Sequence, residues 1–398
     1  MAGGVSASAA RVILKRGREG PVRGGNPWIF SQAIARIEPV QIEAGAIVAV
    51  HDSAGALLGT GYFNPATTIA VRMLAWGETP PVEELVARRL KGALELRRKF
   101  VRTDTDAYRL VNGDGDGLSG VVVDRFGDVL VVQLLTAGAD RMRETIAEAL
   151  RELINPRAIL ERSHGAVRKQ EGLDDRIAIL AGEPVSKTLA SENGIRIHID
   201  FEHGQKTGSF LDQRENRALA STIASGARVL DACCYQGGFA LAALASGAKR
   251  VVAIDTSARA LEWARRNVEL NGHPEAAVEF VHGEAGRFMA ETADRFDLIV
   301  LDPPPLARSR GDAARAGRLY VELNAVAMRA LASGGRLMTF SCSTHFRADD
   351  FVRAVRFAQT NAGRNLRLLA HLGPGPDHPV LLGHAEGEYL TGLLLADL

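Results

Sequence analysis

Cysteine is scarce in this sequence: its 398 residues include three, and two of them, Cys233 and Cys234, are adjacent. Three thiols in this arrangement make neither a disulfide framework nor a C-x-x-C metal pair, so we expect no structural zinc. Long hydrophobic runs are also missing, because no stretch of about 18 apolar residues occurs. The opening MAGGVSASAA has no apolar stretch behind a basic one. We therefore expect a cytoplasmic protein with no membrane partner.

An excess of one charge is missing as well, since 48 Lys and Arg face 47 Asp and Glu, for a net charge of +1. This balance excludes a uniformly basic nucleic-acid binder, but binding depends on where the charge lies. Two segments carry an excess of basic over acidic residues: RVILKRGREGPVR, from Arg11 to Arg23, and VARRLKGALELRRKFVR, from Val86 to Arg102. Both are candidate phosphate contacts. In the second, a solvated helix face explains the charges equally well.

Three patterns follow one another along the chain. Residues 11–78 hold short apolar runs broken by Gly and Pro (RVIL, AIVAVHD, ALLGTGYF and TIAVRML), which predict a small β-barrel or sandwich. Residues 79–190 combine predicted helices over Val82–Val101 and Asp140–Leu153 with the strands GVVVDRF and DVLVVQLL, which indicates a central α+β domain. In residues 191–398 strands and helices alternate as in a doubly wound parallel α/β sheet. The last apolar runs, NLRLLAHL and EYLTGLLLADL, are expected to pair as an antiparallel hairpin at its edge.

The glycine-rich loop NGDGDGLSG of the central domain invites comparison with a calcium site. Leu118 and Ser119 stand where an EF-hand needs an oxygen ligand and a glycine. We interpret the loop as a turn into a hairpin, and we predict no metal site.

The strand ends of the parallel sheet carry the candidate cofactor site, because ligands bind at the carboxyl ends of the strands in such sheets. LDACCYQGGFA places Asp231 at the end of the first strand and Gly237 at the start of the next helix, and Asp255 ends the second strand. A carboxylate there accepts hydrogen bonds from ribose hydroxyls, and glycine lets the backbone approach a ligand closely. The alternative is that both acids cap strand ends.

The fingerprint G-x-G-x-x-G is missing from this turn, because Cys233 and Tyr235 fill positions where glycines are expected. Its absence disfavours a nicotinamide dinucleotide, whose pyrophosphate needs that cradle. S-adenosylmethionine has no phosphate, and its positively charged methionine end suits an acid at Asp231. We therefore expect S-adenosylmethionine as the cofactor.

Two more predicted strands end in residues that could take part in catalysis. Asp302 ends the strand FDLIVLD and precedes three prolines, which fix the chain in a rigid turn suited to support a flat base. Cys342 stands between two serines at the end of LMTFSCS. A thiol there is either a small packing residue or a nucleophile, and the residue pattern alone leaves both open.

The order of these motifs resembles a known family, the cytosine-C5 methyltransferases that act on large-subunit (23S) ribosomal RNA. The resemblance rests on GQKTGSFLDQREN, LDACCYQGGFA, VVAIDTSARALEWARRNVELNG, LDPPP, SCS and PDHPVLLGHAEGEYLTG, and it extends upstream through NPWIFSQAI, YRLVNGDGDGLSGVVVDRFG and AVRKQEGL. It implies an N-terminal PUA domain (an RNA-binding β-barrel), a central α+β domain and a class I, Rossmann-like methyltransferase domain.

The resemblance also implies a covalent mechanism. C5 of a pyrimidine is a weak nucleophile, so a thiolate first adds to C6 and makes C5 enamine-like. The resemblance places this nucleophile at Cys342 and sets Asp302 beside the base, where it can hydrogen-bond the cytosine amino group or protonated N3. Cys233 and Cys234 are then packing residues near the cofactor.

Site residues follow from the same motifs. The residues expected around the cofactor are Gln213, Asp231, Tyr235, Gly237, Asp255, Ser257, Glu284 and Asp302. The residues expected to face RNA are Arg11, Lys15, Arg16, Lys206, Arg214, Arg308 and Arg310. Lys206 and Arg214 are equally consistent with salt-bridged surface residues.

One position departs from the family. Its loop commonly reads aspartate, two prolines and lysine, whereas this chain has Pro305 in the place of the lysine. A proline removes a cation and a backbone donor, so either Arg308 or Arg310 compensates or the target differs. No second cysteine lies beside Asp302, which leaves the base that removes the C5 proton unassigned.

Two alternative functions remain open on the sequence. One is a uridine-C5 RNA methyltransferase, because uracil needs the same thiolate addition. The other is a non-catalytic RNA-binding factor in ribosome assembly that keeps the fold. The expected partner is 23S ribosomal RNA, naked or in an assembly intermediate, and a homodimer is left open.

Overall fold

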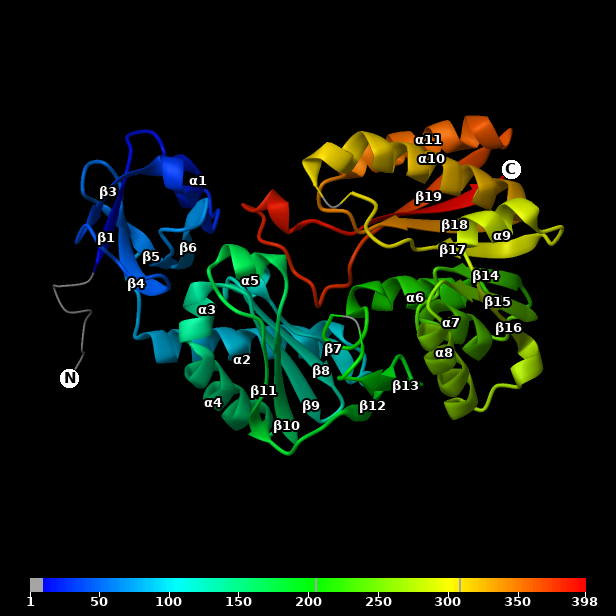
Figure 1. The fold of residues 1–398 in the computed structure, drawn as a ribbon, viewed down its shortest axis with the longest axis horizontal. Coiled ribbons are helices and arrows are strands. Elements are labelled where there is room, and N and C mark those ends of the chain that lie inside the picture. The colour runs from blue at the N-terminus through cyan, green and yellow to red at the C-terminus, as the bar shows by residue number, and fades with distance from the viewer. Residues whose placement is uncertain (1–9, 205, 308) are drawn as a thin grey trace. The chain divides into compact units, whose positions relative to one another are not determined.

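The structure is a computed structural model that describes residues 10–204, 206–307 and 309–398 (Figure 1). Within these ranges the chain forms two compact units. The first takes in the chain up to Ala190 together with Ile199–Ser209 and Pro376–Gly387, and the second takes in Ser191–His198, Phe210–Gly375 and Glu388–Leu398. No helix in the described ranges is long and apolar enough to cross a membrane.

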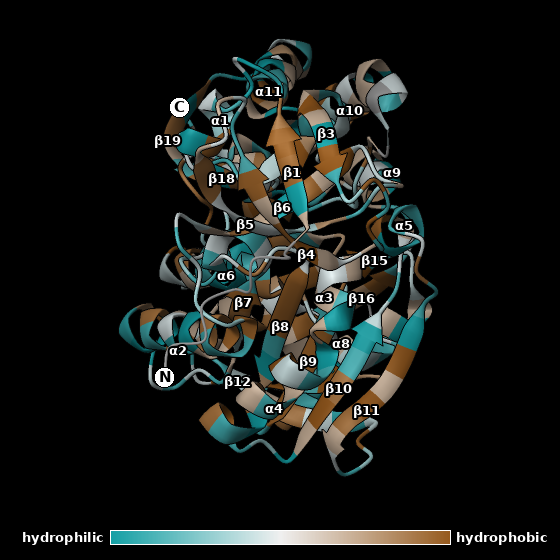
Figure 2. Ribbon diagram, turned by 90° about the vertical axis from the view of Figure 1, so that its left-hand side faces the viewer, coloured by the Kyte–Doolittle hydropathy of each residue, from teal (hydrophilic) through white to brown (hydrophobic). Residues whose placement is uncertain are grey.

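The N-terminal part of the first unit is a sheet of short, mostly apolar strands. Among the described residues it has six strands, in the order β2-β6-β5-β4-β1-β3. These are β1 (Arg11–Leu14), β2 (Trp28–Phe30), β3 (Ile34–Glu38), β4 (Ala46–His51), β5 (Leu57–Phe63) and β6 (Ile69–Trp76), with α1 (Gly20–Arg23) and η1 (Ser31–Ala33) between them. Val48 and Val50 of β4 pack with Val12 of β1 in the core, and Figure 2 shows both strands largely in the brown of hydrophobic residues. The four apolar runs predicted as strands are confirmed as β1, β4, β5 and β6.

The second sheet of the first unit has, in the described part of the chain, five strands in the order β11-β10-β9-β8-β7. Its elements are α2 (Val82–Phe100), β7 (Ala107–Asn112), η2 (Gly113–Asp116), β8 (Val121–Phe126), β9 (Val129–Leu134), α3 (Ala137–Arg141), α4 (Arg143–Ile154), β10 (Ala158–Ser163), α5 (Ala166–Gln170) and β11 (Arg176–Gly182). The loop at η2 connects β7 to β8 and leads into the antiparallel β8–β9 hairpin, as predicted. The helix predicted over Asp140–Leu153 forms as α4, but its predicted start is wrong: Met142 has a ψ of 11°, leaves the helical range and separates α4 from α3.

The second unit is built on a larger sheet of seven strands among the described residues, in the order β16-β15-β14-β17-β18-β20-β19. Its strands are β14 (Arg228–Ala232), β15 (Arg250–Asp255), β16 (Val278–His282), β17 (Phe296–Leu301), β18 (Leu331–Ser341), β19 (Leu366–Leu372) and β20 (Thr391–Asp397). Strands β14 to β18 are parallel, whereas β20 runs antiparallel to both β18 and β19. The predicted antiparallel hairpin at the sheet edge is therefore confirmed. Two shorter strands, β12 (Lys187–Glu192) and β13 (Ile195–Asp200), pair with each other.

Helices cover both faces of this sheet, and Figure 1 shows α9, α10 and α11 on one face and α6, α7 and α8 on the other. These helices are α6 (Arg214–Thr222), α7 (Gly238–Ala245), α8 (Ala258–Leu270), α9 (Ala285–Glu291), α10 (Ala313–Ala330) and α11 (Ala348–Ala362), with the short turns η3 (Leu211–Gln213), η4 (Glu275–Ala277), η5 (Arg310–Asp312) and η6 (Ala385–Gly387) elsewhere in the chain. Strands buried on both faces read as continuous apolar runs, as in LIVL of β17 and VVAI of β15. The doubly wound parallel sheet is thus confirmed.

Candidate active site

The parallel register gathers predicted site residues at one edge of the sheet. Ala232 of β14 is level with Ile254 of β15 and with Leu301 of β17, so the chain segments that follow these strands start side by side. Leu301 is in turn level with Thr339 of β18. Because parallel strands all end at the same edge, the residues at or just after their carboxyl ends become neighbours. They are Asp231, Asp255, Glu284, Asp302 and Cys342.

The turn after β14 has an uncommon backbone. Cys233, Tyr235 and Gly237 have φ values of 67°, 50° and 78°, in the left-handed region that side chains other than glycine seldom adopt. The Tyr235 N–H donates to Oδ2 of Asp255 at 2.8 Å, which ties the turn to β15. A Cβ at Gly237 would lie 3.1 Å from the Cβ of Ala264, so glycine also allows α7 to approach α8 closely.

Asp231 is an unsatisfied buried acid. Its side chain is 1% exposed, and Oδ2 accepts a hydrogen bond from the Ala240 N–H at 2.9 Å. The other oxygen, Oδ1, has no hydrogen-bond partner among the described residues. Burial, together with the charges of Asp302 and Asp255, raises the pKa of Asp231 to about 7. A buried acceptor that lacks a donor fits a ligand carrying a positively charged donor, and the ammonium group of a bound amino acid is such a donor.

Asp255 and Ser257 organise the neighbouring strand end. Oδ1 of Asp255 accepts from the Ser257 N–H at 2.8 Å. The Ser257 hydroxyl caps α8 by accepting from the Ala260 N–H at 3.2 Å. Ser257 thus shapes the loop beside Asp255. Glu284, also predicted as a cofactor residue, is exposed at the start of α9.

Gln213 lies against Asp302, although the two residues are far apart in the sequence. Its Nε2 donates to Oδ2 of Asp302 at 3.0 Å, and its Oε1 accepts from Nδ2 of Asn216 at 2.6 Å. Asn216 was not predicted as a site residue, and nothing in its position within GQKTGSFLDQREN separates it from a surface residue of α6. The buried amide of Gln213 therefore links η3 to the end of β17.

Cys342 contacts the loop that follows Asp302. Its thiol Sγ lies 3.7 Å from the carbonyl oxygen of Pro303, within reach of an S–H donor. The residue is half-buried. At the first strand end, burial and the nearby acids raise the pKa of Cys233 to about 12, and burial also raises the pKa of Cys234. Thiols held protonated in this way are poor nucleophiles, in keeping with the packing role predicted for Cys233 and Cys234.

The predicted RNA-facing residues lie in different settings. Lys15 and Arg16 are exposed after β1, and Arg11 is exposed with its guanidinium 3.1 Å from Glu38. Lys206 is exposed in the first unit with a φ of 51°. Arg214 belongs to the second unit, where it is buried and pairs with Glu215 at 3.0 Å. Arg308 and the side chain of Arg310 lie outside the described residues, so their RNA roles, like the others, stay predictions.

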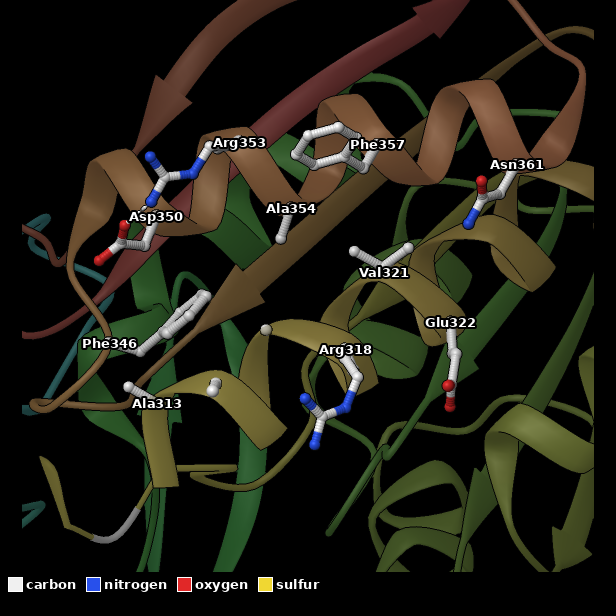
Figure 3. A pocket seen from close by; sticks show the side chains of 12 residues that line it. Ala313, Arg318, Val321, Glu322, Phe346, Asp350, Arg353, Ala354, Phe357 and Asn361 are labelled. Atoms are coloured by element: carbon white, nitrogen blue, oxygen red, sulfur yellow. Dashed lines mark hydrogen bonds and ion pairs between the residues drawn. The ribbon is translucent and has the colours of Figure 1, made fainter. Parts of the chain in front are cut away.

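A groove also opens between α10 and α11, where its volume is about 760 Å³ (Figure 3). The half-exposed ring of Phe357 and the charged side chains of Arg318 and Arg353 line it. None of the predicted site residues is among the described residues that line the groove.

Two protein-family models match this chain. A family model described as S-adenosylmethionine-dependent methyltransferase matches residues 109–346. A second, described as a PUA-like domain, matches residues 12–76. Fold and site thus define a class, the S-adenosylmethionine-dependent methyltransferases, in a form with an N-terminal PUA-like domain. The predicted fold class and cofactor are confirmed.

Relatives that align over nearly all of this chain identify its family within the class. Ribosomal RNA large subunit methyltransferase I of Aeromonas hydrophila is 39% identical over 394 residues, which cover 97% of this chain and 99% of the relative. The protein of the same name from Escherichia coli O139:H28 is 37% identical over 390 residues, covering 96% and 98%. The chain belongs to the family of the ribosomal RNA large subunit methyltransferase I proteins, which confirms the predicted family.

Two solved structures share the fold over most of the chain. A putative SAM-dependent methyltransferase from Streptococcus mutans superposes with a TM-score of 0.82 over 97% of this chain and 99% of that chain, at 21% identity. A putative methyltransferase complexed with SAH superposes with a TM-score of 0.83 over the same shares, also at 21% identity.

Proposed function

We propose that this protein forms 5-methylcytosine in 23S ribosomal RNA, through a covalent bond between the sulfur of Cys342 and C6 of the target base. The observation that carries the proposal is the contact between Cys342 and the loop after Asp302, at the edge of the sheet where Asp231 and Asp255 also lie. A nucleophile, a base-contacting acid and a cofactor site thus share one edge.

The acids of the first two strand ends suit the cofactor. S-adenosylmethionine, when bound, supplies an electrophilic methyl group. We assign the unsatisfied Oδ1 of Asp231 to its ammonium group, because that buried oxygen needs a donor. Asp255 accepts from ribose hydroxyls, and the left-handed turn through Tyr235 and Gly237 lets the backbone approach. Gln213, Ser257 and Glu284 are assigned to the rim of the same site.

Cys342 supplies the electrons that activate the base. Its thiolate sulfur forms a bond to C6, and the electron pair of the C5–C6 double bond moves to C5, which becomes nucleophilic. After methylation at C5, the C5 proton leaves to a base, the C5–C6 double bond re-forms, and the sulfur departs with the electron pair of the S–C6 bond. The chemistry begins and ends with the same thiolate.

Asp302 favours cytosine over uracil in this proposal. A carboxylate accepts hydrogen bonds but donates none, and cytosine presents an amino donor where uracil presents a carbonyl oxygen. The hydrogen bond from Gln213 orients this carboxylate. As C6 is attacked, negative charge builds on the ring, and a proton on N3 that hydrogen-bonds to Asp302 offsets it.

The ribosomal RNA substrate is proposed from the names of the relatives and from exposed cations on the first unit. Besides Lys15 and Arg16, helix α2 carries basic side chains on the face opposite its buried residues. They are Arg88, Lys91, Arg98 and Lys99, all exposed and without an ion pair in the described part of the chain. Glu84 and Glu95 are acids on that face. Cations left unpaired in a chain of balanced charge suit phosphate contacts.

The test is to incubate the protein with methyl-labelled S-adenosylmethionine and undermodified 23S ribosomal RNA, digest the RNA, and identify the labelled nucleoside. We expect 5-methylcytidine, and no label with Cys342→Ala, whose affinity for the cofactor should stay that of the wild type. Labelled 5-methyluridine would support the uridine enzyme instead. No label with any ribosomal RNA, and no cofactor binding, would support the non-catalytic assembly factor.

A further inference from the structure

The loop after Asp302 has few ways to be held in place. Pro303, Pro304 and Pro305 have no backbone N–H, so they cannot donate a hydrogen bond. The first donors beyond them are the N–H groups of Leu306 and Ala307. Both donate to one atom, the hydroxyl oxygen of Ser343, at 3.0 and 3.2 Å. One serine hydroxyl therefore anchors the end of the proline run.

That hydroxyl belongs to a short buried network. The hydroxyl of Tyr320, on α10, donates to the hydroxyl oxygen of Ser341 at 2.8 Å and lies 3.1 Å from the hydroxyl of Ser343. A serine hydroxyl has two acceptor lone pairs and one proton. Because two backbone N–H groups occupy the lone pairs of Ser343, its proton points to Tyr320. Ser341, Tyr320 and Ser343 thus form an ordered chain of hydroxyls, named here the hydroxyl clamp.

Aromatic contacts fix the phenol of Tyr320. Its ring is fully buried, stacks on Phe346 with centroids 5.1 Å apart, and meets Phe351 edge-on at 5.2 Å. Phe346 follows the SCS segment and points toward α10 and α11 in Figure 3. Burial raises the pKa of Tyr320 above its ordinary value, so the hydroxyl keeps the proton that it donates.

Cys342 stands between the two serines of the clamp. Its thiol lies 3.7 Å from the carbonyl oxygen of Pro303, the first residue of the loop that Ser343 anchors at the other end. We propose that the hydroxyl clamp holds the thiol of Cys342 in register with the Asp302 loop, which makes Tyr320 a positioning residue for methyl transfer. This inference rests on the proposed role of Cys342 as the nucleophile.

The expected cost of losing the clamp follows from the geometry of attack. Reacting groups need to be placed within about 0.5 Å, and a misplacement of 1 Å costs on the order of 100-fold in rate. Tyr320→Phe keeps the ring stacked but removes the hydroxyl, and Ser343→Ala frees the proline loop. We expect turnover at saturating cofactor to fall about 10-fold in the first variant and about 100-fold in the second.

Thr339 offers a matched control on the same strand. It is fully buried, and its hydroxyl has no hydrogen-bond partner among the described residues. Thr339→Val removes a buried hydroxyl of β18 outside the clamp, so it should leave turnover unchanged.

The experiment uses the full-length protein and RNA containing 5-fluorocytidine, whose fluorine cannot leave as a cation and so traps the covalent adduct. We expect the trapping rate and the turnover of Tyr320→Phe and Ser343→Ala to fall together, with the KM for S-adenosylmethionine and the thermal midpoint close to wild type. If Tyr320→Phe and Ser343→Ala trap the RNA at the wild-type rate while Cys342→Ala traps nothing, the positioning role of the clamp is overturned. The proposed function is then unaffected. If the slower turnover of Tyr320→Phe and Ser343→Ala is matched by an equal loss of folded protein, the clamp is overturned as well. Trapping that persists in Cys342→Ala would overturn the proposed function and the clamp together.

Discussion

The side-chain amide of Gln213 donates a hydrogen bond to the carboxylate of Asp302, with Nε2 3.0 Å from Oδ2. Asn216 fixes which end of the amide faces Asp302, because its own Nδ2 donates to Oε1 of Gln213. The acid at the end of β17 is thus oriented by a residue that precedes the methyltransferase sheet in sequence. In the proposed function, this carboxylate faces the base.

Replacement of Asp302 by asparagine tests this role. The amide keeps the size of the side chain but removes the negative charge that stabilises a protonated N3, so turnover should fall by about 10²- to 10³-fold. Asp297→Asn is the matched control, because Asp297 is the second residue of the same strand and pairs with Arg228 at 3.1 Å. Steady-state methylation assays compare the two variants, and equal turnover in both would contradict the role of Asp302.

The pKa of Asp231 predicts how stability depends on pH. Its folded-state value of about 7 lies above the ~3.9 of an unfolded aspartate. The stability that its protonated form contributes is therefore fully present below about pH 4 and is lost as pH rises through about 7. Asp231→Asn, which does not titrate, should lack this loss. Denaturant unfolding without cofactor between pH 4 and 8 measures the difference, and parallel curves for the two proteins would be inconsistent with the raised pKa.

Phosphate contacts by helix α2 predict a salt effect. Lys91→Glu and Arg98→Glu should each weaken binding of 23S ribosomal RNA and lower the slope of log K against log salt by about 0.7 per lost contact on single-stranded RNA. Arg151→Glu is the control, because Arg151 is an exposed cation of α4 that already pairs with Glu148. Filter binding at several salt concentrations gives the slopes. If all three variants bind the RNA with the same affinity and salt slope, the basic side chains of α2 face solvent and do not contact phosphates.

Arg97 is expected to be a stability determinant of the first unit. Its buried guanidinium lies 2.6 and 2.8 Å from the two carboxylate oxygens of Asp116, and it donates to the carbonyl oxygen of Asp377 at 2.6 Å. Arg97→Met leaves Asp116 buried without its cation, which should cost ~3–5 kcal/mol. Arg102→Met removes an exposed pair with Asp104 and should cost ~0–1 kcal/mol. Chemical unfolding of the two variants checks the difference.

Much of the site could be predicted because it depends on topology. Apolar runs that end in Asp231, Asp255 and Asp302 identify parallel strands, and parallel strands bring their carboxyl ends together. The same rule places Cys342 near the Asp302 loop. Predicting such features requires only the order of the strands in the sheet.

The remaining features depend on how side chains pack in three dimensions. The periodicity of α10 predicts a helix, but it does not reveal that the hydroxyl of Tyr320 reaches two serines of β18 and its following loop. Arg214 reads as a surface cation beside Gln213, yet the structure buries it against Glu215. Hydrogen bonds between residues far apart in sequence follow from tertiary contacts that no local pattern encodes.

The most direct test of the central claim is to trap the protein on ribosomal RNA that contains 5-fluorocytidine, digest the complex, and find the modified peptide by mass spectrometry. The proposed mechanism predicts one adduct, on Cys342, which forms only with S-adenosylmethionine present and is absent from Cys342→Ala. An adduct on Cys233 or Cys234, or undiminished methylation by Cys342→Ala, would contradict it.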